Sequence, residues 1–173
     1  MDLIKKARKF ATRAHKGQFR KYTGEPYIVH PIAVAETVRL HGGSDEMVAA
    51  ALLHDTIEDT NVTYDDVRKE FGITVAGLVR ELTDTSSPSD GNRAVRKEID
   101  RRRLAKASAD AQTIKLADLI DNTTSIVAHD PGFAKVYLKE KEALLKVMNK
   151  GLADLRVTAW CQVAHEVLGA KHA

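Results

Sequence analysis

Four side chains that can bind a metal ion or move a proton fall within LLHDTIEDT, residues 52–60: His54, Asp55, Glu58 and Asp59. Residues four positions apart lie on one face of a helix, which pairs His54 with Glu58 and Asp55 with Asp59. His54 and Asp55 are separated by about a third of a helical turn. They can therefore bind one ion only where the end of a helix points at it, and further ligands must come from elsewhere in the chain.

Two more residues are candidates for the same site. His30 follows the extended stretch GEPYIV at a predicted helix start, and Asp118 interrupts the apolar face of TIKLADLIDN. A buried carboxylate is costly without a partner such as a cation. Two imidazoles with two carboxylates form a mixed nitrogen and oxygen site that suits Mn, Fe or Zn. A metal with open positions can polarise a phosphoryl oxygen and ionise a bound water, so the pattern predicts a metal site that is suited to hydrolysis.

The elements that must position these residues are predicted to be helices. Capping residues and breakers are frequent, whereas hairpin turns and runs of β-branched residues are nearly absent. His30-Pro31 resembles an N-cap followed by proline, and Gly72 divides two helices. We expect an all-α bundle of about eight to nine helices, at about 2–16, 30–40, 44 to the HD pair, 63–72, 73–83, 93–106, 111–129, 131–150 and 153–168.

Length and composition restrict the class of protein. The chain has 173 residues, 43% hydrophobic and 29% charged, which fits one domain with a real core. No apolar run approaches the roughly 20 residues that span a bilayer, and no signal peptide is evident. A single cysteine, Cys161, suits a reducing compartment, so we expect a cytoplasmic protein. The net charge of +3 permits an anionic small molecule and disfavours nucleic acid as a partner.

The longer motifs resemble a known family. The stretches are AHKGQFRKYTGEPYIVHPIAVA (14–35), AALLHDTIEDT (50–60), FGITVAGLV (71–79) and IKLADLIDN (114–122). In order and spacing they are similar to the hydrolase domain of the RelA/SpoT homologue superfamily, within the HD phosphohydrolases. The resemblance implies an HD-domain helical bundle forming a single domain over 1–173, with its core at about 5–150 and a C-terminal helix at about 153–168. The chain is too short for the family's synthetase and regulatory domains, so it is similar to a stand-alone small alarmone hydrolase.

The resemblance also implies roles for individual residues. The family's metal ligands, usually around one Mn²⁺, match His30, His54, Asp55 and Asp118. The pair that positions and activates the attacking water matches Glu58 and Asp59. Matches to the nucleotide-binding residues are Arg20, Lys21, Asn122, Tyr137, Arg101, Arg102 and Arg103.

The implied reaction is hydrolysis of the 3′-diphosphate of (p)ppGpp, releasing pyrophosphate and GDP or GTP, as in the stringent response. Two departures leave the base open: RKYTGEPY is one residue longer than the family's usual RKSGEPY, and Leu119-Ile120-Asp121-Asn122 replaces Arg-Leu-His-Asn. The alternatives are a (p)ppApp hydrolase, a phosphatase acting on NADPH or a nucleotide, and a non-catalytic alarmone-binding module. A homo-oligomer is possible through the helix KVYLKEKEALLKVM.

Some residues also have an ordinary structural interpretation. The arginine run 101–103 fits a solvated helix face as well as a phosphate site. Lys115 either lines the site or extends from a buried helix to solvent. The other histidines have no matching partners and are interpreted as structural or surface groups: His15, His41, His129, His165 and His172.

Overall fold

The structure is a computed structural model that describes residues 2–169, so His172 lies outside the described residues. Among these residues all regular structure is helical, apart from one isolated bridge between Phe19 and Pro26. None of the described helices is long and apolar enough to cross a bilayer. The helices are α1 (Leu3–Ala14), α2 (Val29–Leu40), α3 (Asp45–Leu53), α4 (Thr56–Asp59), α5 (Tyr64–Leu82), the 3₁₀ turn η1 (Pro88–Asp90), α6 (Arg93–Lys106), α7 (Ala109–His129), α8 (Pro131–Val147) and α9 (Ala153–Gly169). The prediction of an all-α fold is confirmed.

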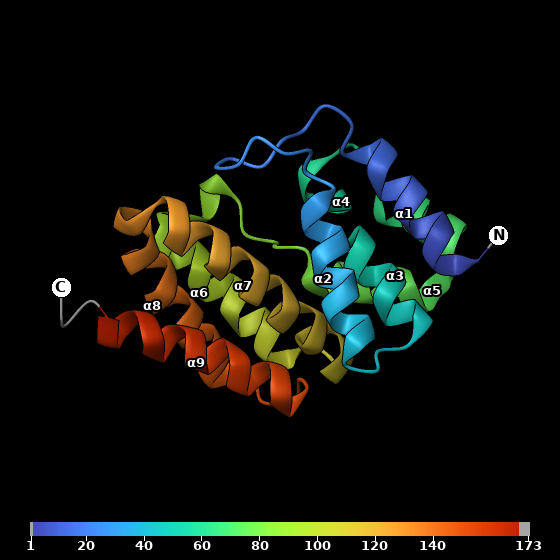
Figure 1. The fold of residues 1–173 in the computed structure, drawn as a ribbon. Coiled ribbons are helices and arrows are strands. Elements are labelled where there is room, and N and C mark those ends of the chain that lie inside the picture. Colours follow the sequence, from blue (N-terminus) through green and yellow to red (C-terminus); the bar gives the residue numbers. More distant parts are fainter. Residues whose placement is uncertain (1, 170–173) are drawn as a thin grey trace. The chain divides into compact units, whose positions relative to one another are not determined.

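The chain divides into two compact units, one ending at Asp84 and one beginning at Thr85. The first unit is built around α3, which packs against α1, α2 and α5 (Figure 1). Every residue of α3 from Met47 to Leu53 is buried. The side chain of Ser44 caps this helix by accepting a hydrogen bond from the Met47 N–H at 3.3 Å. Because the helix is buried on all sides, the residues that directly follow Leu53 are held in a fixed position.

The start of α2 differs from the prediction, which made His30 the N-cap. The helix begins at Val29, and its N-cap is Ile28, which makes no capping bond through its side chain. A turn precedes the helix, because the N–H of His30 donates to the carbonyl of Tyr27 at 3.0 Å. Pro31 is then the third helical residue, where no N–H is needed for the helix ladder. His30 consequently lies inside the first turn, and its side chain is buried.

The predicted boundary at Gly72 is a sharp kink inside α5. The backbone of Gly72 has φ 85° and ψ 173°, a conformation that is essentially restricted to glycine. The helix itself begins with a capping box, in which Thr63 and Asp66 exchange hydrogen bonds. Gly77, further along α5, is an ordinary helical residue with open space where a Cβ would lie.

The second unit consists of η1 and α6–α9, in which α7 packs against α8 and α9. Asn92 caps α6, while α7 begins at Ala109, two residues before the predicted start. Helix α8 ends at Val147, before the predicted Lys150. The chain between α8 and α9 is held by the buried side chain of Gln112, whose Oε1 accepts from the Lys150 N–H at 2.9 Å. The single-domain organisation stays a prediction.

Candidate metal centre

Three predicted ligands lie together in the first unit. The Nε2 atom of His54 is 3.1 Å from Oδ2 of Asp55, and Nε2 of His30 is 3.7 Å from the same oxygen. One ligand atom from each residue lies within 4.8 Å of the other two. The exposed fractions of His30 and His54 are only 2% and 3%. The three side chains come from the first turn of α2, the end of α3 and the residue before α4.

A break in the helix allows the neighbours His54 and Asp55 to converge. The sequence predicts that this helix ends at the His54-Asp55 pair, with no helix directly after it; in the structure α3 ends at Leu53 and the short helix α4 starts at Thr56. His54 is the C-cap of α3, and Asp55, with φ −93° and ψ −5°, is the N-cap of α4. The hydroxyl of Thr56 donates to the Leu53 carbonyl at 2.7 Å and stabilises the junction. Both side chains therefore project from the end of a buried helix.

Hydrogen bonds orient two of the donor groups. Nδ1 of His54 is 2.8 Å from the carbonyl oxygen of Ala51. A carbonyl can only accept, so Nδ1 carries the hydrogen, and in the neutral ring the lone pair is on Nε2. The hydroxyl of Tyr27 donates to Oδ2 of Asp55 at 2.6 Å. Such partners behind the donor atoms fix the tautomer and orientation of metal ligands.

The donor set fits a divalent metal ion. A neutral His54 presents its Nε2 lone pair to a carboxylate oxygen 3.1 Å away, and these two groups repel unless a cation lies between them. Donors that share one metal at roughly 2.1 Å are about 3 to 3.5 Å apart, which is close to the separations around Asp55. Two imidazole nitrogens and a carboxylate oxygen also suit borderline metals better than thiophilic ones.

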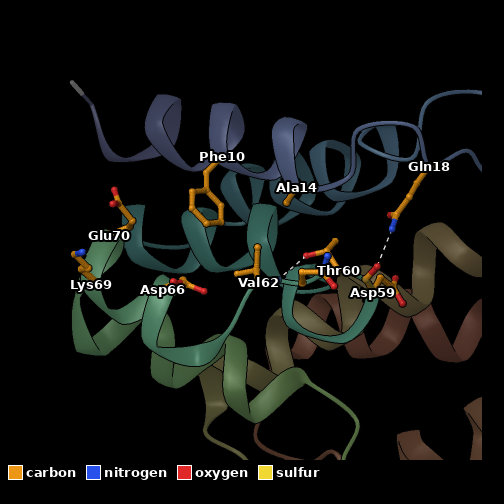
Figure 2. Close-up of a pocket in the computed structure, with 10 residues that line it drawn as sticks. Phe10, Ala14, Gln18, Asp59, Thr60, Val62, Asp66, Lys69 and Glu70 are labelled. Carbon is orange, nitrogen blue, oxygen red and sulfur yellow. Dashed lines mark hydrogen bonds between the residues drawn. The ribbon is translucent and has the colours of Figure 1, made fainter.

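The two carboxylates assigned to water activation lie on α4, beside the ligands. Oε2 of Glu58 accepts a hydrogen bond from the Asp84 N–H at 3.1 Å. Desolvation, followed by the negative charge of Asp55, raises the pKa of Asp59, and the nearby Tyr27 side chain opposes this rise. Asp59 also lines a cavity of about 530 Å³ in the first unit, together with Gln18 (Figure 2). An exposed carboxylate next to a metal site can take a proton from water.

Asp118, the fourth predicted ligand, belongs to the second unit, where it is buried on α7. Its Oδ2 pairs with Nζ of Lys115 at 2.7 Å, and its Oδ1 accepts from Nδ2 of Asn122 at 2.6 Å. The Tyr137 hydroxyl donates to the Leu119 carbonyl at 3.3 Å. Burial, and then the charge of Asp118, raises the pKa of Tyr137. Three predicted site residues of the second unit, Asp118, Asn122 and Tyr137, therefore lie near one another.

The predicted basic residues have partners within their own segments. Nζ of Lys21 lies 3.2 Å from the hydroxyl of Tyr22 and 4.7 Å from the centre of its ring. The backbone N–H of Arg20 donates to the carbonyl of Glu25 at 2.8 Å, which stabilises the loop that carries both cations. On α6, Arg101 and Arg102 both pair with Glu98, as expected for a solvated helix face. Nucleotide binding by these residues and by Arg103 stays a prediction.

The sequence analysis missed the residues behind the ligands. Tyr27 was not singled out, although it directly orients Asp55, and Gln18 was not considered. His15 was interpreted as a structural or surface group. It is buried, and its side chain contacts both Gln18 and Tyr27. The only signal was their position within the matched stretch AHKGQFRKYTGEPYIVHPIAVA (14–35), which also contains His30.

The chain is similar to known proteins over most of its length. The HD domain family matches residues 7–144. A guanosine-3′,5′-bis(diphosphate) 3′-pyrophosphohydrolase of Xenopus tropicalis is 34% identical over 154 residues, which cover 87% of this chain and 84% of the relative. A protein with the same enzyme name from Aquifex aeolicus is 38% identical over 125 residues, 71% of this chain but only 18% of that longer protein.

A solved structure extends the comparison to the fold. It is of a metazoan ortholog of SpoT, described as hydrolysing ppGpp, and superposes with a TM-score of 0.86 at 28% identity. The match covers 95% of this chain and 96% of that one. The family match covers most of the sequence, including the three clustered ligands, and the chain therefore belongs to the HD domain family.

Proposed function

We propose that this protein hydrolyses the 3′-diphosphate of ppGpp, releasing pyrophosphate and GDP, in a metal-dependent reaction. The observation that carries the proposal is the cluster of His30, His54 and Asp55, with Glu58 and Asp59 on the adjoining helical turn. Relatives with this enzyme name and the solved SpoT ortholog support the choice of substrate. The same reaction on pppGpp yields GTP.

Within the reaction, Glu58 and Asp59 orient the attacking water and accept its proton. The water oxygen bonds to the phosphorus attached to the ribose 3′ oxygen, and the bond between that phosphorus and the 3′ oxygen breaks. The 3′ oxygen takes up a proton, so that a hydroxyl and pyrophosphate are left. A bound divalent metal supplies charge neutralisation on the phosphoryl oxygens and acidifies water. The hydrogen bond from Tyr27 holds the carboxylate of Asp55 in its orientation toward His30 and His54.

The finer assignments rest on the sequence. Mn²⁺ is proposed as the resident metal, and Asp118 as its fourth ligand. Arg20, Lys21, Asn122, Tyr137 and Arg101–Arg103 are proposed to bind the nucleotide through charge-assisted hydrogen bonds and stacking. A cytoplasmic location and the absence of nucleic-acid partners remain part of the same proposal, as does possible self-association.

The test is product analysis with several substrates. Purified protein with Mn²⁺ is incubated with ppGpp, ppApp, NADPH and a nucleotide monophosphate, and the products are separated by ion exchange. We expect pyrophosphate from ppGpp, loss of activity on chelation, and its return with Mn²⁺. Asp59→Asn and Glu58→Gln should each lower kcat by about 10²- to 10⁴-fold, because the water loses its base. Asp65→Asn, on the exposed side of α5, is the matched control and should keep full activity.

The outcomes separate the alternatives. Faster turnover of ppApp than of ppGpp would replace guanine by adenine as the preferred nucleobase of the substrate and leave the reaction unchanged. Release of single phosphates alone, or tight ppGpp binding without turnover, would exclude a pyrophosphohydrolase. Metal loss in Asp59→Asn as complete as in His54→Ala would refute the assignment of Asp59 as a base that is not a ligand.

A further inference from the structure

A buried histidine outside the ligand set lies behind the candidate metal centre. His15 is the C-cap of α1, and its exposed fraction is 3%. Its Nδ1 is 2.6 Å from Oε1 of Gln18, and its ring lies 4.8 Å from the ring of Tyr27, centre to centre. The backbone joins the same three residues, because the Gln18 N–H donates to the His15 carbonyl and the Tyr27 N–H donates to the Gln18 carbonyl.

The direction of these hydrogen bonds follows from their acceptors. Nε2 of Gln18 donates to the carbonyl of Asp59 at 2.7 Å, as Figure 2 shows, so Oε1 is the acceptor for His15. His15 therefore donates through Nδ1. Its Nε2 is buried and has no hydrogen-bond partner among the described residues. An apolar side chain would fill this space without leaving a nitrogen unsatisfied, which makes the Nδ1 donor the reason for a histidine here.

Two contact paths connect His15 with the reacting groups. The first runs through Gln18 to the backbone of Asp59, the carboxylate assigned to water activation. The second runs through Tyr27, whose hydroxyl donates to the metal-ligand oxygen Oδ2 of Asp55 at 2.6 Å. The ring of Tyr27 also packs edge-on against the ring of His30 at 5.9 Å. All these residues belong to the first unit.

We propose that His15 is a positioning residue that acts through Gln18 on Asp59 and through Tyr27 on Asp55. Its side chain contacts Gln18 and Tyr27, and it acts through them. It holds the two intermediaries so that one orients the base and the other orients the metal carboxylate. Partners behind the ligands typically change metal affinity by 10- to 100-fold when they are removed. This inference rests on the proposed function for its Asp59 path only, since the Asp55 path concerns metal binding alone.

The test separates the two paths by measuring Mn²⁺ affinity, by electron paramagnetic resonance, and kcat on ppGpp. Tyr27→Phe should weaken Mn²⁺ binding by roughly 10- to 100-fold. Gln18→Ala should lower kcat by about tenfold or more and leave Mn²⁺ affinity unchanged, since a misplaced base slows proton transfer. His15→Ala should do both. His15→Asn places an amide donor near the position of Nδ1, so it should restore most of kcat but not the Mn²⁺ affinity.

The control is His41→Ala, because His41 is exposed and its Nδ1 contacts only its own helix, at the carbonyl of Thr37. Melting curves identify any variant that does not fold; if His15→Ala is one of these, His15→Asn and the two partner variants still decide. Wild-type values for both quantities in His15→Ala, or equal losses in His41→Ala, would overturn the inference. A wild-type protein that binds Mn²⁺ but does not cleave ppGpp would refute the proposed function, while the affinities of Tyr27→Phe and His15→Ala would still decide the Asp55 path.

Discussion

At the residue scale, the site depends on groups that pair with the chemically active atoms. The carbonyl of Ala51 sets the tautomer of His54, and the hydroxyl of Tyr27 sets the direction of Asp55. Both partners are neutral, so neither contributes a charge to the site. Their contribution is that the donor atoms are already oriented before a metal arrives, which reduces the conformational entropy lost on binding.

Lys141 on α8, in the second unit, is a buried charged residue. Its environment leads to a prediction about how stability depends on pH. Its exposed fraction is 1%, and its ammonium donates to Thr123 at 2.8 Å and to Gln162 at 2.6 Å. Desolvation lowers the pKa of Lys141 to about 8. Between about pH 8 and the ordinary lysine value near 10.4, the unfolded chain binds more protons than the folded one, so stability should rise with pH.

Comparison with Lys141→Met isolates this effect. The free energy of unfolding of the wild type, minus that of the variant, should increase by up to a few kcal/mol from about pH 7 to about pH 10. Urea titrations at both pH values measure this difference. Lys139→Met, which removes an exposed lysine from the same helix, is the control and should show no comparable increase. A difference for Lys141→Met that does not change with pH would contradict the lowered pKa.

At the element scale, the kink in α5 predicts contrasting effects for two glycines in the same helix. Gly72→Ala forces a side chain into a backbone conformation with φ 85° and should destabilise the protein by about 1 to 3 kcal/mol. Gly77→Ala adds a methyl group where nothing lies within 4 Å and should be neutral or stabilising by about 0.4 to 1 kcal/mol. Urea midpoints of the two variants measure the contrast, and equal effects would rule out the kink as the cause.

How far the elements could be predicted depends on how local their causes are. Caps such as Ser44 and Thr63 act over three residues, and the helix starts predicted at 44 and 63 agree with α3 and α5. The end of α3 was predicted to within about two residues, but the short helix α4 was not, because its junction with α3 depends on the hydroxyl of Thr56 and on burial. The contacts of His15 were not predicted for a related reason. Its contact with Tyr27 spans the loop after α1, and no periodicity encodes such a contact.

At the scale of the whole molecule, the predicted site residues are distributed over two compact units. The first unit holds the clustered ligands His30, His54 and Asp55 and the carboxylates Glu58 and Asp59. The second holds Asp118, Asn122 and Tyr137. Motif spacing brought together the candidate ligands His30, His54 and Asp55, whereas the side-chain environment of each group depends on contacts that the sequence pattern does not encode. The site's metal dependence should therefore be visible in stability as well as in activity.

Metal binding should raise the thermal stability of the protein, because the unfolded chain does not hold His30, His54 and Asp55 together. At Mn²⁺ about 100-fold above its Kd, binding adds about 2.7 kcal/mol to the free energy of unfolding. For a chain of this size that corresponds to an increase in Tm of roughly 5 to 10 °C. Differential scanning calorimetry with Mn²⁺ and with a chelator measures the increase.

Variants then connect the increase in Tm with individual residues. His54→Ala should abolish the increase in Tm, because the substitution removes a candidate ligand that the carbonyl of Ala51 orients. Glu58→Gln should keep it, since Glu58 is assigned to water and not to the metal. Asp118→Asn should reduce it if Asp118 completes the ligand set, and an unchanged increase in that variant would remove Asp118 from the set. An equal increase in His54→Ala and the wild type would mean that Mn²⁺ stabilises the protein from another site, and the proposed centre would lose its thermodynamic support.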